Sequence, residues 1–103
     1  MKQNPTLEAA RLFCFLLEEL KRMGVTGNIV LFADAWKQRP ESNRVGINAE
    51  VTIEMNGTLQ QAFNYPDETA KAFLARFNEG VTRLGWWWDI GTERTLHFYP
   101  IAK

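Results

Sequence analysis

Cysteine and histidine are nearly absent from this chain of 103 residues, which carries only Cys14 and His97. A single cysteine cannot form an intramolecular disulfide, whereas small secreted domains usually hold several, so we expect a reducing compartment, the cytoplasm. A zinc site needs several cysteine or histidine ligands, and we therefore expect neither a metal nor another cofactor. Nucleophilic chemistry would have to use His97, and a small enzyme built around it is the third of three functional hypotheses.

Net charge and long apolar runs are missing as well. Lys and Arg total 12, as do Asp and Glu, so the formal net charge is zero. Nucleic-acid-binding domains usually carry a basic excess. The longest apolar run covers residues 12–17, whereas a membrane span needs about 20 residues. The start of the chain also lacks the pattern of a signal peptide. The sequence thus argues against nucleic acid and against a membrane as the partner.

The periodicity that is present predicts an α+β domain. The length predicts a single domain over residues 1–103. Helical spacing and capping residues predict two helices, and alternation predicts about five strands. We expect a helix from Asn4 and Pro5 to Gly24, strands over 28–36, 44–55 and 58–65, a helix over 66–84, and a hairpin over 86–90 and 93–102. The order α-β-β-β-α-β-β predicts a two-layer sandwich, with both helices on one face of a mainly antiparallel sheet.

The dipeptide Asn56-Gly57 is interpreted as the turn between the second and third strands. A two-residue turn would put the apolar faces of these strands on opposite sides of the sheet. A three-residue loop with Gly57 in the left-handed conformation brings them together, with Ile53 opposite Leu59. We therefore expect a positive φ at Gly57.

The order α-β-β-β-α over residues 4–84, with a tight turn between the second and third strands, resembles that of double-stranded-RNA-binding domains. The resemblance implies RNA binding through lysines at the start of the second helix. Here that place holds residues 66–71, which include Asp67 and Glu68. The alternative function is therefore a nucleic-acid-binding domain that uses the basic loop 37–44, where Lys37, Arg39 and Arg44 follow Trp36.

The first predicted helix has an apolar arc wider than packing against one sheet requires. Cys14 and Leu17 lie on this arc together with Phe13, and we expect all three to be buried. Phe15 falls instead in the middle of the charged arc. We expect its ring to be exposed in the isolated domain unless another element covers it, and to contact a partner.

Three consecutive tryptophans begin the predicted closing hairpin. With a two-residue turn at Gly91-Thr92, alternation places Trp87 on the core face with Leu96 and Phe98. The opposite face then carries Trp86, Trp88, His97 and Tyr99. Tryptophan and tyrosine are frequent anchors of protein interfaces. The other possibility is that the rest of the domain buries both faces of the hairpin.

These features favour a small non-enzymatic protein-binding module of the adaptor, inhibitor or immunity-protein kind. Its predicted partner-binding residues are those of the outer hairpin face, together with Phe15. The partner is a protein or a second copy of the chain, in which case the module is a homodimer.

Overall fold

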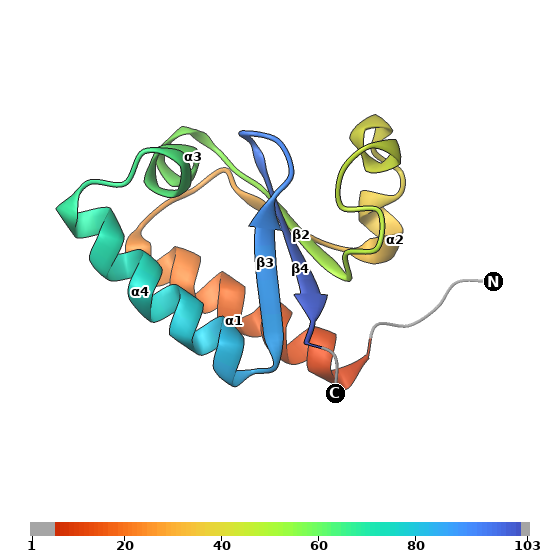
Figure 1. The fold of residues 1–103 in the computed structure, drawn as a ribbon, viewed down its shortest axis with the longest axis horizontal. Helices are drawn as coiled ribbons and strands as arrows, with labels where there is room; N and C mark the ends of the chain where they lie inside the picture. Colours follow the sequence, from red (N-terminus) through yellow and green to blue (C-terminus); the bar gives the residue numbers. More distant parts are fainter. Residues whose placement is uncertain (1–5, 102–103) are drawn as a thin grey trace.

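The computed structural model describes residues 6–101, which form an α+β fold (Figure 1). Its strands form one antiparallel sheet in the order β1-β2-β4-β3. Within the described range the elements are α1 (Leu7–Met23), β1 (Ile29–Phe32), α2 (Ala33–Trp36), the 3-10 helix η1 (Pro40–Asn43), β2 (Val51–Glu54), α3 (Gly57–Asn64), α4 (Glu68–Arg83), β3 (Trp86–Ile90) and β4 (Thr95–Pro100). The predicted class is confirmed, but the described part has four strands and four α-helices instead of five and two.

The sheet separates a large core from a smaller cap. Helices α1 and α4 pack on one face of the sheet, where α1 passes behind β3 in Figure 1, while α2 packs on the other face through Trp36 and His97. The core between the sheet and the two long helices is built from aliphatic side chains of α1 and β2, aromatic rings of α3 and α4, and the inward residues of the hairpin. The short segment of α2 and η1, which we call the cap, covers only part of the opposite face. The part of that face formed by β3 and β4 is left open.

Helix α1 packs through only part of the apolar arc that the sequence suggests, since Leu12, Leu16 and Leu20 are buried. Its predicted start at Asn4 and Pro5 lies outside the described residues, and Thr6 caps the helix by accepting a hydrogen bond from the Ala9 N–H at 3.0 Å. The predicted end is confirmed, because Gly24 adopts a φ of 77°. The prediction that Cys14 and Leu17 are buried is wrong, since both are exposed.

Helix α4 covers the part of the predicted charged arc that holds Phe15 and Glu19. Glu19 is buried there and forms ion pairs with Arg76 at 3.4 Å and Arg22 at 3.7 Å. Phe15 lies over Gly80, where a Cβ atom would overlap its ring. A charged arc is therefore not a reliable solvent face when a neighbouring helix supplies the opposite charge.

The first two predicted strands are shorter than expected because the chain leaves the sheet between residues 33 and 50. Only residues 29–32 and 51–54 pair as strands. The segment between them forms α2 and η1, and Trp36 of α2 is buried against the outer face of the sheet. The alternating pattern over residues 44–55 thus reflects a strand only at its end.

The predicted third strand is a helix, α3. Asn56 acts as its N-cap, with the side-chain oxygen 2.6 Å from the N–H of Gly57. The prediction of a positive φ at Gly57 is wrong, and Ile53 lies opposite Val30 and Leu96 instead of Leu59. Leu59 and Phe63 are four residues apart, as on one face of a helix, and both are buried in the core. The order α-β-β-β-α is therefore not present, and the topological resemblance to RNA-binding domains is lost with it.

The predicted second long helix and the two strands of the closing hairpin are present. Helix α4 begins after Asp67, whose carboxylate accepts a hydrogen bond from the Ala70 N–H at 2.8 Å. The chain turns at Gly85, where φ is 94°. It then forms the β3–β4 hairpin, which completes the four-stranded sheet.

Candidate functional surface on the hairpin

Strands β3 and β4 pair in a register different from the predicted one. Trp88 lies opposite Phe98 instead of Thr95. Because this shift is by an odd number of residues, it exchanges the faces of β3 relative to β4. Trp86 and Trp88 therefore face the core, and Trp87 lies on the outer face.

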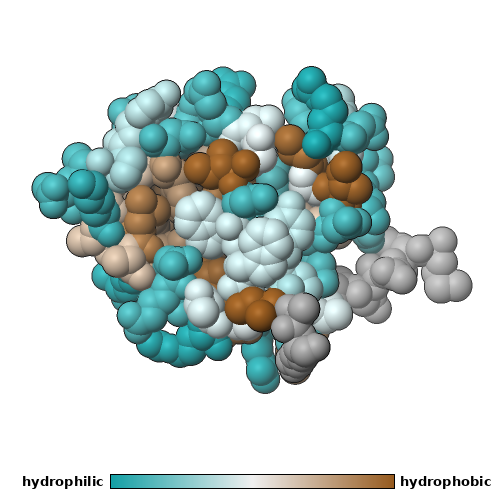
Figure 2. All heavy atoms as spheres, viewed as in Figure 1, coloured by the Kyte–Doolittle hydropathy of each residue, from teal (hydrophilic) through white to brown (hydrophobic). Residues whose placement is uncertain are grey.

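The outer face of the hairpin carries a stacked aromatic pair, in which Trp87 is exposed and Tyr99 is half-buried. Trp87 and Tyr99 lie opposite each other, and their rings stack with centroids 4.5 Å apart and planes 25° apart. The Trp87 side chain is 47% exposed, and Ile101, two residues after Tyr99, is exposed as well. Figure 2 shows a pale area over the hairpin bordered by brown, apolar residues. We call Trp87, Tyr99 and Ile101 the hairpin surface.

This surface adjoins an unpaired edge, because β3 is the last strand of the sheet. The N–H of Gly91 donates to the Thr95 carbonyl, and the N–H of Ile101 donates to the Gly85 carbonyl. Hydrogen-bonded pairs alternate along an antiparallel ladder, so the N–H and C=O groups of residues 86, 88 and 90 point away from β4. The strand has no lysine, proline or bulge, and of the devices that commonly protect an edge it has only one charged side chain, Asp89. It can therefore accept another strand.

The four predicted partner-binding residues of the hairpin lie on two different faces. His97 and Tyr99 lie on the outer face as expected, but only Tyr99 reaches the hairpin surface, because α2 covers His97. Trp86 is buried in the core, and Trp88 is half-buried, with its ring against Phe63 at a centroid distance of 5.3 Å. The prediction that these four side chains form one outward patch is wrong.

The fifth predicted residue, Phe15, lies far from the hairpin surface in the fold, on the helical layer. Its ring is half-buried and lies 6.3 Å from that of Phe77, so the prediction of an exposed ring is also wrong. Sequence reasoning missed Trp87, which it assigned to the core. The signal that could have identified it is the turn, because a longer loop after Gly91 reverses the faces of β3.

His97 is the only histidine of the chain and is completely buried between the sheet and its cap. Its Nδ1 lies 2.9 Å from the Thr52 hydroxyl, and its Nε2 lies 2.9 Å from the Thr95 hydroxyl. The Trp36 ring packs against the imidazole with centroids 5.0 Å apart. Burial lowers the pKa of His97, and the carboxylate of Asp89 opposes this effect only in part. Both ring nitrogens are engaged inside the fold, so His97 is a packing residue of β4 beneath α2.

We expect the stability of the fold to fall as the pH drops below about 6.5, the ordinary pKa of histidine. Because the pKa of His97 is lowered in the folded state, the unfolded chain binds the proton more tightly in this range. The stabilising contribution is complete above the unfolded pKa and is lost as the pH falls towards the folded one. Urea unfolding between about pH 5 and 8 measures the slope, and His97→Gln should flatten it. An imidazole that titrates at or above 6.5 by NMR would contradict this.

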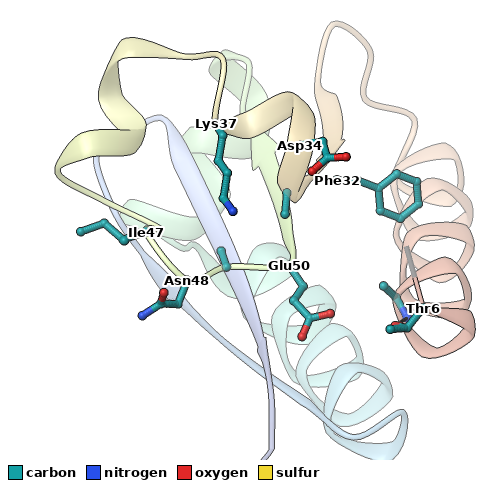
Figure 3. Close-up of a pocket in the computed structure, with 10 residues that line it drawn as sticks. Thr6, Phe32, Asp34, Lys37, Ile47, Asn48 and Glu50 are labelled. Carbon is teal, nitrogen blue, oxygen red and sulfur yellow. Dashed lines mark hydrogen bonds between the residues drawn. The ribbon is translucent and has the colours of Figure 1, made fainter. Parts of the chain in front are cut away.

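The basic loop lies beside a polar pocket of about 390 Å³ between the start of α1 and α2 (Figure 3). Lys37 lines this pocket together with the carboxylates of Asp34 and Glu50, and Thr6 and Asn48 complete its polar lining. A phosphate placed here would meet two negative charges for one ammonium group. The pocket therefore does not favour anions.

The other two cations of the loop add little attraction for phosphate. Arg39 forms a bidentate pair with Glu54, with N–O distances of 2.8 and 3.2 Å. Arg44 is exposed on the surface. The loop thus presents one exposed arginine free of the acidic pocket and of this ion pair.

Among residues 6–101, no three His, Cys, Asp or Glu side chains gather closely enough to hold a metal ion. No helix in the same range combines the length and the apolar character needed to cross a bilayer. Comparisons with protein-family models, with curated proteins and with solved structures find no match to this chain.

Proposed function

We propose that the chain is a non-enzymatic protein-binding module, of the adaptor, inhibitor or immunity-protein kind, that binds an extended segment of another protein along β3. The observation that carries this proposal is the stacked Trp87–Tyr99 pair on the open face of an edge strand without lysine, proline or bulge. An added strand would satisfy the outward backbone groups of β3, while its side chains cover the hairpin surface. Stacking holds both rings in place before binding, which reduces the entropy lost on association.

The charge beside the aromatic pair indicates which segment fits. Asp89 follows Trp87 by two residues, so both side chains leave β3 on the same face. Asp89 is exposed and forms no ion pair in the described part of the chain. A complementary strand therefore carries an apolar side chain next to Trp87 and a lysine or arginine two residues away, next to Asp89.

Selection from a displayed library of random linear peptides tests this function. Enriched peptides should share an apolar residue and a basic residue two positions apart. Trp87→Ala should weaken their binding by about 2 kcal/mol, or roughly 30-fold, because it removes the anchor. Ile47→Ala is the matched control, since Ile47 is an exposed apolar residue outside the hairpin. Asp89→Lys should shift the selection away from basic residues.

Hydrogen exchange gives a second readout that a general hydrophobic attraction would not produce. A bound strand should slow exchange at the amides of residues 86, 88 and 90, which point towards the free edge. Failure to enrich any peptide would overturn the proposal. Enriched peptides that bind Trp87→Ala as tightly as the unmodified chain would also overturn it.

The alternative, nucleic-acid binding through loop 37–44, has less support. The ion pair of Arg39 and the acidic pocket around Lys37 both reduce the attraction for phosphate. Duplex RNA or DNA should accordingly show no salt-dependent binding near physiological ionic strength, as measured by fluorescence anisotropy.

A further inference from the structure

The polar pocket between the start of α1 and α2 is a hollow lined by three alanines from different parts of the fold. These are Ala9 of α1, Ala33 of α2 and Ala49, which precedes β2. The N–H of Ala33 donates to the Glu50 carbonyl at 3.1 Å and so holds α2 beside the chain that enters β2. Because an alanine side chain is a single methyl group, the three leave a volume of about 390 Å³, within the range of small-molecule sites. We call this hollow the α2 pocket.

The α2 pocket is lined by one positive and two negative side chains. Asp34 lies within α2 and Lys37 directly follows it, while Glu50 directly precedes β2. Among residues 6–101, Lys37 forms an ion pair with neither carboxylate, and the carboxylates pair with no other cation. The three charges thus lie around one hollow without neutralising one another by direct contact.

The donor and acceptor groups occupy different sides of the pocket. In the view of Figure 3, the Lys37 side chain extends on the same side as Asn48, whereas Asp34 lies on the side of Phe32. The Glu50 carboxylate lies between these two sides. An ammonium and an amide NH₂ group donate hydrogen bonds to a carboxylate, and the two carboxylates accept hydrogen bonds from cations. The pocket therefore offers one place for a negative group and two for positive groups.

We propose that the α2 pocket binds a free amino acid with a cationic side chain, of the lysine type. The ligand carboxylate lies beside the Lys37 ammonium and the Asn48 amide. The α-ammonium group lies beside Glu50, and the cation of the ligand side chain lies beside Asp34, with its methylene groups against Phe32. The pocket shares no residue with the hairpin surface, so this site goes beyond the proposed function.

Simpler ions fit the same charges less well. A lone carboxylate or phosphate meets one more negative than positive charge. A diamine or a divalent cation is attracted by Asp34 and Glu50 but repelled by Lys37. A basic amino acid carries two positive groups and one negative group, and this pattern is complementary to that of the pocket.

NMR titration of the full chain with three compounds that share one carbon skeleton tests this site. The compounds are L-lysine, L-norleucine, which lacks the side-chain ammonium, and cadaverine, which lacks the carboxylate. L-Lysine should shift the amide signals of residues 33–37 and 48–50 and reach saturation. The other two should bind about fivefold more weakly, because each loses one charge pair.

Three variants assign the charge pairs and the hollow itself. Lys37→Ala should weaken L-lysine about fivefold and strengthen cadaverine, so that their order reverses. Asp34→Asn should remove the difference between L-lysine and L-norleucine. Ala33→Leu should abolish binding because it fills the hollow while every charge remains, and urea unfolding checks that this variant is folded. Glu18→Gln is the control, since this exposed carboxylate of α1 lies outside the pocket, and it should bind L-lysine like the unmodified chain.

The remaining outcomes each overturn the proposal. A titration without saturable shifts means that the pocket does not bind this class of ligand. Cadaverine that binds the unmodified chain as tightly as L-lysine means that Lys37 meets no carboxylate. Binding that survives Ala33→Leu lies elsewhere on the surface. Because peptide binding is predicted to depend on Trp87 and amino-acid binding on the α2 pocket, failure of either idea leaves the other standing.

Discussion

Trp86→Ala should lower the free energy of unfolding by about 3–5 kcal/mol, the range found when large aromatic side chains are removed from protein cores. Trp86 is only 2% exposed and belongs to the cluster between the sheet and the long helices. The neighbouring substitution Trp87→Ala should cost about 1 kcal/mol, since it removes one stacked contact with Tyr99 at the surface. Urea unfolding followed by circular dichroism measures both changes.

The comparison between adjacent tryptophans is the control, because both substitutions remove the same side chain from the same strand. Trp88→Ala should fall near Trp86→Ala, since the Trp88 ring packs on Phe63 and its Nε1 donates to Asn78 at 3.2 Å. A domain that tolerates Trp86→Ala but unfolds on Trp87→Ala would contradict the register of the hairpin. It would also remove the basis of the proposed binding surface.

The hairpin shows how far sequence reasoning reaches here. The two strands are predictable from their β-forming residues and from the turn residues between them. The faces are not, because three identical side chains in a row fit either orientation and only the loop length decides. Ile90 lies opposite Leu96, and the intervening turn is held by the Thr95 hydroxyl, which accepts from the Thr92 N–H at 2.9 Å. A turn stabilised by a side chain is harder to recognise than a two-residue turn with glycine.

Asn56-Gly57 was open to two local interpretations. The pair is a strong signal for a hairpin, but asparagine is also among the best N-cap residues. The spacing of Leu59 and Phe63 by four residues favours the helix, and burial of both side chains stabilises it. The alternating residues before Asn56 nevertheless continue to suggest a strand. Tertiary contacts of α3 with α4 resolve this conflict, and no local pattern contains them.

The candidate surface was predictable as a region but not as a set of residues. The aromatic content of the hairpin and the outward position of Tyr99 follow from the sequence. The burial of His97 does not, because it depends on the segment 33–49 folding back over the sheet. That segment contains Trp36, whose Nε1 donates to the Val45 carbonyl at 3.2 Å. This hydrogen bond joins α2 to the chain that follows η1. Long-range packing of this kind leaves no periodic signal.

The second large loss of stability is expected for a substitution at Gly46, beside the cap. This residue has a φ of 62°, and a Cβ atom built on it would overlap the imidazole of His97. Gly46→Ala should therefore combine about 1–2 kcal/mol of left-handed strain with about 1–3 kcal/mol of overpacking. The ring cannot retreat, because Gly91 approaches it closely as well and both its nitrogens are held by threonine hydroxyls.

Gly24→Ala separates the two contributions to the effect at Gly46. Gly24 has a φ of 77°, but no atom lies within 4 Å of the position its Cβ would take. This control should therefore lose only the strain contribution, about 1–2 kcal/mol. Adding His97→Ala to Gly46→Ala should be less costly than the two single changes together, since the smaller side chain relieves the overlap. Equal losses for Gly24→Ala and Gly46→Ala in urea unfolding would mean that the cap yields without cost. His97 would then not be locked between the sheet and the cap, and the expected dependence of stability on its protonation would lose its structural basis.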